Sequence, residues 1–239
     1  MPPVDQKWEL VVVMPVYNEE ASIRKVLLEW GLELSRWTQS FHFLVIDDGS
    51  TDETANILDE LKQSEGSKLT ILSQRNIGHG QTCLRGYTWA IRQNVRYVLQ
   101  LDSDGQCDPK FFHEFWSQRE KCDVIYGRRF IRDDGMFRSL ASKCMRITIA
   151  LSSLVVCCDA NVPYRLMQTS VLPPVLAKIP PEFHLANVAL AVLLRKSPGV
   201  KHGCVSIRFR KRYGGTPSVR FGKFIHRAWQ LVGQLRTLP

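Results

Sequence analysis

The sequence lacks a hydrophobic run long enough to cross a membrane. Its longest apolar stretch, about residues 147–158, is shorter than the roughly 20 residues that a bilayer-spanning helix needs, and Ser152 and Ser153 interrupt it. The N-terminus is polar and turn-forming, so no apolar segment typical of a secretory signal precedes the first predicted strand. We therefore expect a chain without a membrane-spanning segment.

Regularly spaced cysteines are also absent. The chain has seven cysteines, an odd number, of which Cys157 and Cys158 are adjacent and the others are scattered. This pattern argues against a disulfide framework and against a zinc site, both of which need paired or repeated spacings. We expect a reducing compartment, the cytoplasm.

The composition is that of an ordinary globular protein with an excess of positive charge. Of the 239 residues, 44% are hydrophobic and 23% are charged, which argues against disorder. The net charge of +9 indicates anionic partners: nucleic acid, nucleotide phosphates or an acidic membrane surface. No low-complexity linker or internal repeat divides the chain. We expect one large domain over residues 1–220 and an amphipathic helix or tail over residues 221–239.

Short apolar runs alternate with helical patterns along the first half of the chain. The predicted strands cover residues 10–14, 41–46, 68–72, 96–101 and 122–126, with a further strand at 203–209. Continuous apolar runs of this length are typical of strands buried on both faces of a parallel sheet. The pattern predicts an α/β fold with a mostly parallel central sheet and flanking helices. Polar residues follow the strands, at the edge where open α/β sheets bind ligands.

The fourth predicted strand ends in two carboxylates, Asp102 and Asp104, one residue apart. Such a pair offers oxygen ligands to a hard divalent cation, especially when a phosphate completes the coordination. Because short motifs recur by accident, the pair alone is explained as well by a solvated turn.

Three motifs, taken together, resemble family 2 glycosyltransferases with the GT-A fold. They are Met-Pro-Val-Tyr-Asn-Glu-Glu at residues 14–20, Ile-Asp-Asp-Gly-Ser-Thr-Asp at 46–52 and Leu-Asp-Ser-Asp-Gly-Gln at 101–106. The resemblance is closest to the polyprenyl-phosphate (dolichyl-phosphate) mannosyl- and glucosyltransferase branch and covers about residues 9–220. Segments 127–129, 138–143 and 212–218 resemble later elements of the same branch.

The resemblance implies a binding site for a nucleotide diphosphate sugar of the GDP-mannose or UDP-glucose type, with Asp48 accepting hydrogen bonds from the base. The implied donor-binding residues are Pro15, Tyr17, Glu19, Asp48, Gly80, Asp102 and Ser103. The implied ligands of Mg²⁺ or Mn²⁺ are Asp102, Asp104 and Gln106. The ion would act as a Lewis acid on the leaving nucleoside diphosphate. Helix capping remains an alternative role for the acidic residues of 47–52, and a plain turn remains one for 76–80.

Three arginines are implied to orient phosphates, since a guanidinium offers forked donors to phosphate oxygens. They are Arg129, which with Asp102 and Asp104 we also expect to be catalytic, and Arg138 and Arg212. A solvated basic face is the alternative. The segment 159–167 departs from the branch pattern but keeps Asp159, which contacts the sugar, orders the arginines or forms a structural salt bridge.

The class of sugar acceptor is inferred from the absence of an acidic catalytic base in a Glu-Asp pair. Family 2 enzymes that glycosylate hydroxyls usually carry an acidic base, often in a Glu-Asp pair, where this chain reads Pro-Glu-Phe-His-Leu-Ala-Asn at 181–187. Only Glu182 or His184 could substitute there. A phosphate acceptor is already anionic and needs no strong base. We therefore expect inverting transfer to a polyprenyl phosphate by a peripheral protein at the inner face of the membrane.

Three other functions agree less well with the sequence than transfer to a polyprenyl phosphate. A family 2 transferase acting on a hydroxyl of a polysaccharide or lipopolysaccharide precursor would need the missing base. A nucleic-acid-binding module would explain the charge of +9, but strand-end carboxylates repel phosphate unless a metal intervenes. A sugar nucleotidyltransferase would carry a glycine-rich basic loop after the first strand, where residues 16–20 stand instead.

The tail at 221–239 either lies in a membrane interface or packs on the domain.

Overall fold

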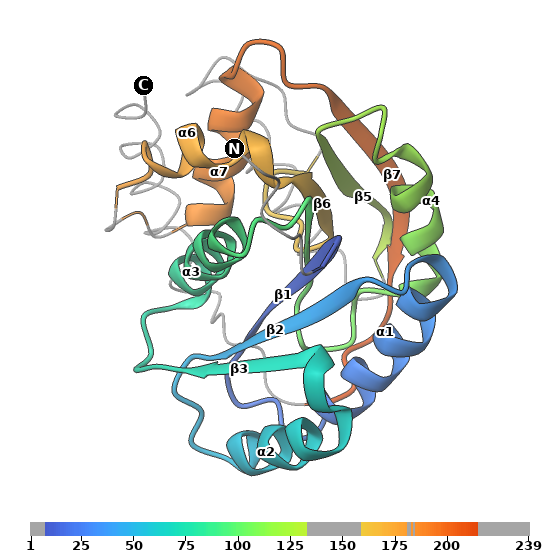
Figure 1. The fold of residues 1–239 in the computed structure, drawn as a ribbon, viewed down its shortest axis with the longest axis vertical. Coiled ribbons are helices and arrows are strands. Elements are labelled where there is room, and N and C mark those ends of the chain that lie inside the picture. Colours follow the sequence, from blue (N-terminus) through green and yellow to red (C-terminus); the bar gives the residue numbers. More distant parts are fainter. Residues whose placement is uncertain (1–7, 133–158, 181–182, 184, 215–239) are drawn as a thin grey trace, which may run out of the picture.

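The computed structural model describes residues 8–132, 159–180, 183 and 185–214. In these residues a seven-stranded sheet lies between two layers of helices (Figure 1). The predicted division at residue 220 and the tail 221–239 fall outside the described residues. Within those residues, no helix combines the length and the apolar character needed to cross a membrane.

The sheet is mostly parallel, which confirms the prediction from the apolar runs. Its strands follow the order β3-β2-β1-β4-β6-β5-β7, and β6 is antiparallel to both of its neighbours. The strands are β1 (Leu10–Val16), β2 (Phe41–Asp47), β3 (Leu69–Ser73), β4 (Tyr97–Gln100), β5 (Val124–Arg132), β6 (Arg165–Gln168) and β7 (His202–Phe209).

The central strands explain why the sequence reads as apolar runs. Every residue of β1, β2 and β4 is buried, because helices cover both faces of the sheet. In the parallel register, Val16 pairs with Asp47, and Val13 pairs with Gln100. The polar segments that follow β1, β2 and β4 therefore start at one edge of the sheet.

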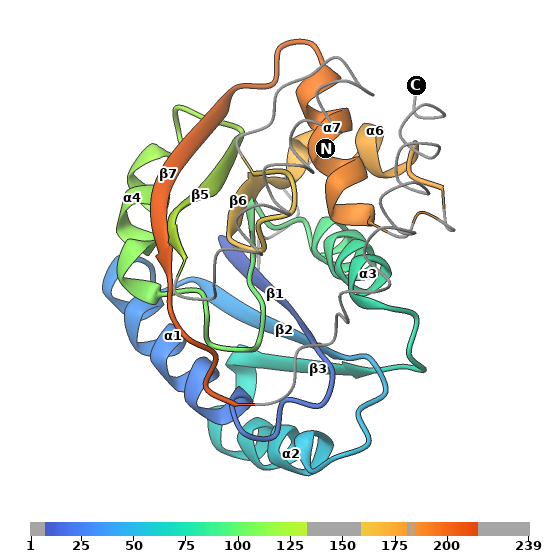
Figure 2. The same cartoon turned by 180° about the vertical axis from the view of Figure 1, so that it is seen from behind.

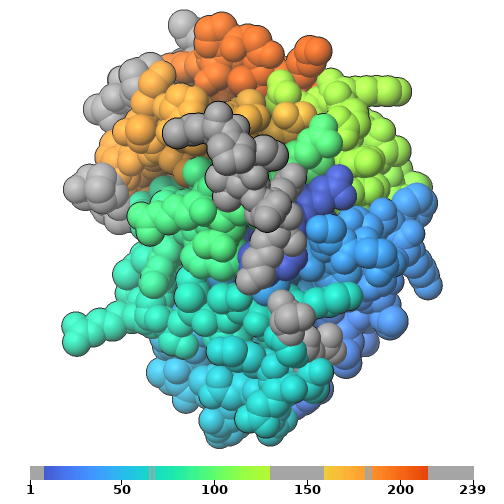
Figure 3. Space-filling view, in the orientation of Figure 1, coloured from blue at the N-terminus to red at the C-terminus, as the bar shows by residue number. Residues whose placement is uncertain are grey.

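The helices divide into two groups, one on each face (Figures 1 and 2). On one face lie α1 (Ile23–Trp37), α2 (Thr54–Glu65) and α4 (Phe112–Gln118), and on the other lie α3 (His79–Arg92), α6 (Pro173–Leu176) and α7 (Ala186–Lys196). The predicted apolar stripe of α1 is buried, from Ile23 to Leu34. The space-filling view shows the blue and cyan N-terminal segments below and the orange segments around α7 at the top (Figure 3).

Strand β6 was not predicted from the sequence. It has only four residues, too few for an alternating pattern, and it begins at Arg165, an unusual residue for the middle of a sheet. The Arg165 side chain is fully buried and donates hydrogen bonds to the carbonyl oxygens of Ala160, Val162 and Asn187. Backbone acceptors from three places thus satisfy a guanidinium that the sequence pattern alone would place on the surface.

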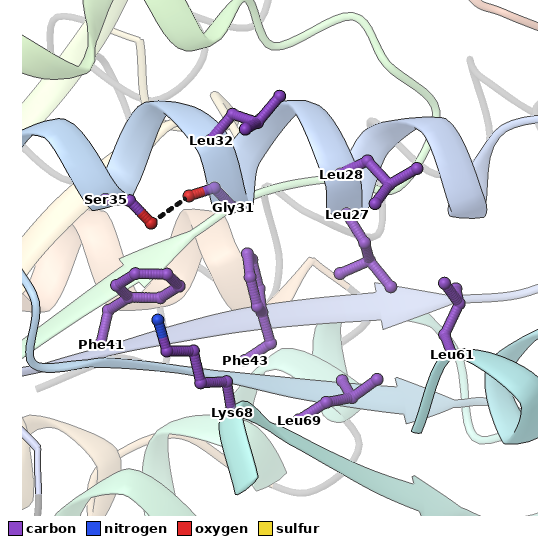
Figure 4. A pocket seen from close by; sticks show the side chains of 10 residues that line it. All are labelled: Leu27, Leu28, Gly31, Leu32, Ser35, Phe41, Phe43, Leu61, Lys68 and Leu69. Carbon is purple, nitrogen blue, oxygen red and sulfur yellow. Dashed lines mark hydrogen bonds between the residues drawn. The ribbon is translucent and has the colours of Figure 1, made fainter. Parts of the chain in front are cut away.

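An apolar cavity of about 200 Å³ opens between α1 and the strands β2 and β3 (Figure 4). On the α1 side Leu27 points toward the strands, where Phe41 and Phe43 of β2 line the cavity, whereas Leu28 and Leu32 are 48% and 71% exposed at its rim. This cavity lies beside the start of β2, whereas the polar segment follows the end of that strand. It is therefore separate from the ligand-binding edge expected from the sequence.

Two helix glycines provide a matched test of packing. Helix α3 lies so close to β1 that a Cβ at Gly86 would lie 2.3 Å from Val13 Cγ1, whereas a Cβ at Gly31 would meet Phe43 Cε2 at an ordinary 3.9 Å. We expect Gly86→Ala to lower the free energy of unfolding by about 1–3 kcal/mol, because the core is overpacked. Gly31→Ala should raise it by up to about 1 kcal/mol through helix propensity. Urea unfolding measures both, and equal effects of the two substitutions would contradict the packing argument.

Candidate active site

The loops that follow β1 and β2 are tied together by side chains. Asn18 has a left-handed backbone conformation (φ 53°). Its side-chain Oδ1 accepts a hydrogen bond from the Thr51 backbone amide at 2.8 Å, and its backbone amide donates one to Ser50 Oγ at 3.0 Å. The Glu19 amide donates to Thr54 Oγ1 at 2.9 Å. These bonds hold the two predicted donor motifs side by side.

Asp48 anchors a third loop to this edge. Its side chain is only 3% exposed. Oδ1 accepts hydrogen bonds from Gln74 Nε2 at 2.7 Å and from the Ile77 amide at 2.9 Å, and Oδ2 accepts one from the Gly78 amide at 2.9 Å. A carboxylate has about four acceptor positions, so these three bonds leave room for one more donor. Asp48 therefore fixes the loop before α3 and can still accept one hydrogen bond.

The other predicted donor-binding residues gather at the same edge. Ser103 is 4% exposed, and its hydroxyl donates to the Pro15 carbonyl at 3.1 Å, which joins the end of β1 to the loop after β4. The Tyr17 side chain is 43% exposed and is open to a ligand. Gly80 lies in the first turn of α3, two residues after the Gly78 amide that Asp48 holds.

Asp102 and Asp104 concentrate negative charge in the loop after β4. Asp104 is 7% exposed, and its Oδ1 accepts a hydrogen bond from the Gln106 amide at 3.0 Å. Burial first, and then the neighbouring Asp102, raise the pKa of Asp104 to about 6. Asp102 Oδ1 is buried and has no hydrogen-bond partner among the described residues, although His79 Nε2 lies 3.5 Å away.

These features fit a divalent cation. A buried carboxylate oxygen without a hydrogen-bond donor and a second carboxylate with a raised pKa both indicate negative charge that neighbouring groups compensate only in part, and a cation would neutralise it. Within the described ranges, no group of three histidine, cysteine or acidic side chains is placed to hold a metal. The cation would therefore need further oxygen ligands, for which Gln106 and a phosphate group are candidates.

Two of the predicted phosphate-binding arginines are paired with carboxylates. Arg129 makes a two-pronged contact with Asp159, with Nε and Nη2 donating at 2.6 and 2.7 Å, and both side chains are 14% exposed. Arg212 forms ion pairs with Glu19 and, at 3.5 Å, with Asp104. Of the roles left open for Asp159, the structure shows a salt bridge that orders an arginine. Arg212 lies at the candidate cation site.

Several predicted positions lie outside the described residues. They are Arg138, Glu182, His184, the segment 138–143 and the residues of 212–218 beyond Gly214.

Sequence reasoning missed a buried polar cluster beside the two aspartates. The Tyr87 hydroxyl donates to Gln100 Oε1 at 2.5 Å and to Asn187 Oδ1 at 3.3 Å, and the Asn187 amide nitrogen lies 3.4 Å from His79 Nε2. The cluster links α3, β4 and α7. One signal was present in the sequence: His79, Cys83 and Tyr87 recur every four residues and so share one face of α3.

Comparison with known proteins identifies the family. Residues 11–177, more than half of the chain, match the family described as Glycosyl transferase family 2. The chain belongs to glycosyl transferase family 2. This confirms the resemblance inferred from the three motifs.

Relatives within glycosyl transferase family 2 include two bacterial proteins named undecaprenyl-phosphate 4-deoxy-4-formamido-L-arabinose transferase. The chain is 32% identical over 147 residues to the protein from Photorhabdus laumondii, covering 61% of this chain and 44% of the relative. It is 30% identical over 168 residues to the protein from Pseudomonas fluorescens, covering 70% of this chain and 49% of the relative. The chain thus spans about half the length of the curated relatives it matches.

Solved structures of similar fold confirm the GT-A architecture. One is glucosyl-3-phosphoglycerate synthase from Mycobacterium tuberculosis in complex with Mn²⁺, UDP-glucose and phosphoglyceric acid, with a TM-score of 0.68, 17% identity, and coverage of 97% of this chain and 81% of that one. Another, described as a mycobacterial protein, has a TM-score of 0.63, 16% identity, and coverage of 97% and 76%.

The anchoring role of Asp48 can be tested directly. We expect Asp48→Asn to lower the free energy of unfolding by about 1–3 kcal/mol, because an amide NH₂ would replace one carboxylate oxygen and leave a buried donor without an acceptor, either the Gly78 amide or, with the side chain turned over, the Ile77 amide and Gln74 Nε2. Hydrogen exchange at those two amides should accelerate. Asp59→Asn, at an exposed position of α2, serves as the control. Unchanged exchange at Ile77 and Gly78 would mean that Asp48 does not hold this loop.

Proposed function

We propose that this protein is an inverting, metal-dependent glycosyltransferase that moves a hexose from a nucleotide diphosphate sugar to a polyprenyl-phosphate acceptor. The observation that carries the proposal is the convergence of Asp48, Asp102 and Asp104 at the carboxyl ends of β2 and β4, the two parallel strands on either side of β1. The names of the curated relatives support a polyprenyl-phosphate acceptor, and the similar fold solved with Mn²⁺ and UDP-glucose supports the donor class.

On the donor side, the loops after β1 and β2 form the nucleoside site. Asp48 uses its remaining acceptor position for an N–H of the base, and the exposed Tyr17 ring lies against the nucleoside. Pro15 and Glu19 complete this wall, and Ser103 and Gly80 bring backbone close to the sugar and the diphosphate. A uracil or a guanine base would satisfy Asp48, since each presents an N–H donor.

The diphosphate lies beside Asp102, Asp104 and Gln106, which together would hold Mg²⁺ or Mn²⁺. Such an ion supplies Lewis acidity where negative charge develops on the departing nucleoside diphosphate. The raised pKa of Asp104 and the hydrogen-bond deficit of Asp102 support this assignment.

The acceptor is a phosphate that attacks the anomeric carbon from the face opposite the leaving group. It is anionic near neutral pH, so no strong base is required. Arg129 stands within β5, held by Asp159 through Nε and Nη2, and keeps the N–H groups of Nη1 for an approaching phosphate. Arg138 would add further positive charge there. Transfer to a sugar hydroxyl remains the rival, and it would require Glu182 or His184 as a base.

A lipid acceptor implies action at the membrane surface. We place the catalytic domain in residues 1–220 at the cytoplasmic face, with the basic amphipathic stretch 221–239 as the candidate contact with anionic lipids.

The cation assignment predicts metal-dependent ligand binding. UDP-sugars or GDP-sugars should raise the melting temperature with Mn²⁺ present and have little effect without it. Asp104→Asn should abolish this stabilisation and lower the transfer rate by about 100-fold or more, because the ion that stabilises the leaving group is lost. Glu60→Gln, on the exposed face of α2, should behave as wild type. If no nucleotide sugar stabilises the wild-type protein with Mn²⁺, the proposal fails.

The acceptor class is tested by offering both kinds of nucleophile. We expect radiolabelled sugar to appear on a polyprenyl phosphate and not on neutral hydroxyl acceptors. The double variant Glu182→Gln, His184→Gln should retain transfer to the phosphate, since that nucleophile needs no base. Transfer to a hydroxyl acceptor alone, lost in the double variant, would establish the rival function.

A further inference from the structure

Residues 210–214, here called the strap, follow β7 and run beside the loop that carries the candidate cation ligands (Figure 2). The Tyr213 amide donates to the Asp104 carbonyl at 3.1 Å, and the Arg210 amide donates to the Gln106 carbonyl at 3.0 Å. The Tyr213 ring lies directly on Gly105, where an added Cβ would come within 2.4 Å of the ring. The strap and the loop 104–106 are therefore packed as one unit.

A separate set of contacts fastens the strap to α1. Tyr213 Oη donates to the carboxylate of Glu29, with both oxygens at 2.8 Å, and Arg210 Nη2 donates to the same carboxylate at 2.9 Å. Lys25 Nζ lies 3.9 Å from the centre of the Tyr213 ring. These anchors do not involve the candidate cation ligands, so the strap has a means of attachment that is independent of Arg212.

The Arg212 side chain reaches from the strap to two carboxylates that are almost removed from water. Glu19 and Asp104 have side chains that are 9% and 10% exposed, and Arg212 is 22% exposed. Arg212 Nη2 pairs with Glu19 Oε1, and Nη1 lies 3.5 Å from Asp104 Oδ2. Carboxylates this far from water need hydrogen-bond donors or a nearby positive charge. In this structure the Arg212 side chain supplies a positive charge to both carboxylates.

We propose that Arg212 is an internal counter-ion of the cation site, which gives up Asp104 when a divalent cation binds and then pairs with the diphosphate of the donor. The inference rests on the proposed function, and it assigns Arg212 to the donor diphosphate, where the sequence indicated acceptor phosphate. A cation on Asp104 and a guanidinium beside the same carboxylate repel each other, so each weakens the binding of the other. A diphosphate beside the cation removes that conflict, because it offers the displaced guanidinium new anionic partners.

The arrangement makes cation binding depend on the nucleotide. Without nucleotide, a cation must displace Arg212 from Asp104, which lowers its affinity. With nucleotide, the guanidinium gains the diphosphate oxygens, and the cation and the nucleotide bind cooperatively. Arg212 thus positions the nucleotide and balances charge. It weakens the binding of the cation alone and strengthens the binding of the nucleotide.

The test measures both effects in Arg212→Gln. Mn²⁺ affinity without nucleotide is obtained from the EPR signal of unbound Mn²⁺, and UDP and GDP affinities are obtained by calorimetry at saturating Mn²⁺. We expect the variant to bind Mn²⁺ about five- to tenfold more tightly, because a competing charge is gone, and to bind the preferred nucleotide about tenfold more weakly, because a forked phosphate contact is lost. A purely structural role for Arg212 would weaken both.

Controls separate the guanidinium from the strap and from net charge. Arg210→Gln removes the side-chain hydrogen bonds from the strap to Glu29 and to the Gly105 carbonyl but keeps the Arg212 guanidinium, and Arg24→Gln removes one exposed charge of α1 that pairs with Glu60. Both should keep the wild-type Mn²⁺ affinity. Arg212→Lys keeps a charge without the fork, so its Mn²⁺ affinity should lie between those of wild type and Arg212→Gln, and it replaces the glutamine variant if that protein does not fold.

Two results would overturn the inference. One is a Mn²⁺ affinity in Arg212→Gln, or in Arg212→Lys if only that variant folds, that is equal to or weaker than that of wild type. The other is an equal gain of Mn²⁺ affinity in Arg210→Gln, which would assign the effect to strap displacement. In either case, binding of a nucleotide by the wild-type protein with Mn²⁺ would leave the proposed function standing, whereas absence of that binding would remove the proposed function itself.

Discussion

Carboxylates are buried in the loops where the parallel strands end, and the structure depends on the groups that compensate their negative charge. Glu19, Asp48 and Asp104 are all buried, and they lie in the loops that follow β1, β2 and β4. A buried carboxylate must find donors or a cation. Asp48 finds the backbone amides at the start of α3, whereas Glu19 and Asp104 find Arg212, almost two hundred residues after Glu19. The same requirement therefore draws the two ends of the described chain to one edge of the sheet.

This requirement also explains which parts could be predicted from the sequence. The central parallel strands β1, β2 and β4 were predictable because they are short, mainly apolar runs, and the polar loops at their ends were predictable because polar motifs follow those runs. The antiparallel β6 was not, since four residues around a buried Arg165 show no periodicity. The partners of the arginines were not predictable either. That Arg129 meets Asp159 and Arg212 meets Glu19 is decided by tertiary packing between distant segments, for which a single sequence carries no spacing rule.

The residue type alone does not identify the partner of an arginine. A forked guanidinium suits a phosphate and a carboxylate equally, so a basic cluster in a sequence does not reveal which partner is present. In this structure Arg129 is held by two short hydrogen bonds to Asp159, while Arg212 shares its charge between two carboxylates with a looser 3.5 Å contact to Asp104. The first arrangement favours a fixed charge, and the second favours one that can change partners.

The place of β6 has a consequence for how the chain assembles. Strands β1 to β4 come from residues 10–100 and can pair as soon as they are synthesised, but β5 meets β4 only through β6, which is made more than thirty residues later. Until then β4 presents an open edge and β5 has no neighbour in the growing sheet. Open edges are templates for unwanted pairing with other chains. A ribosome paused between β5 and β6 would prolong the exposure of this edge, with the segments after β1, β2 and β4 already synthesised and β5 still without a strand to pair with.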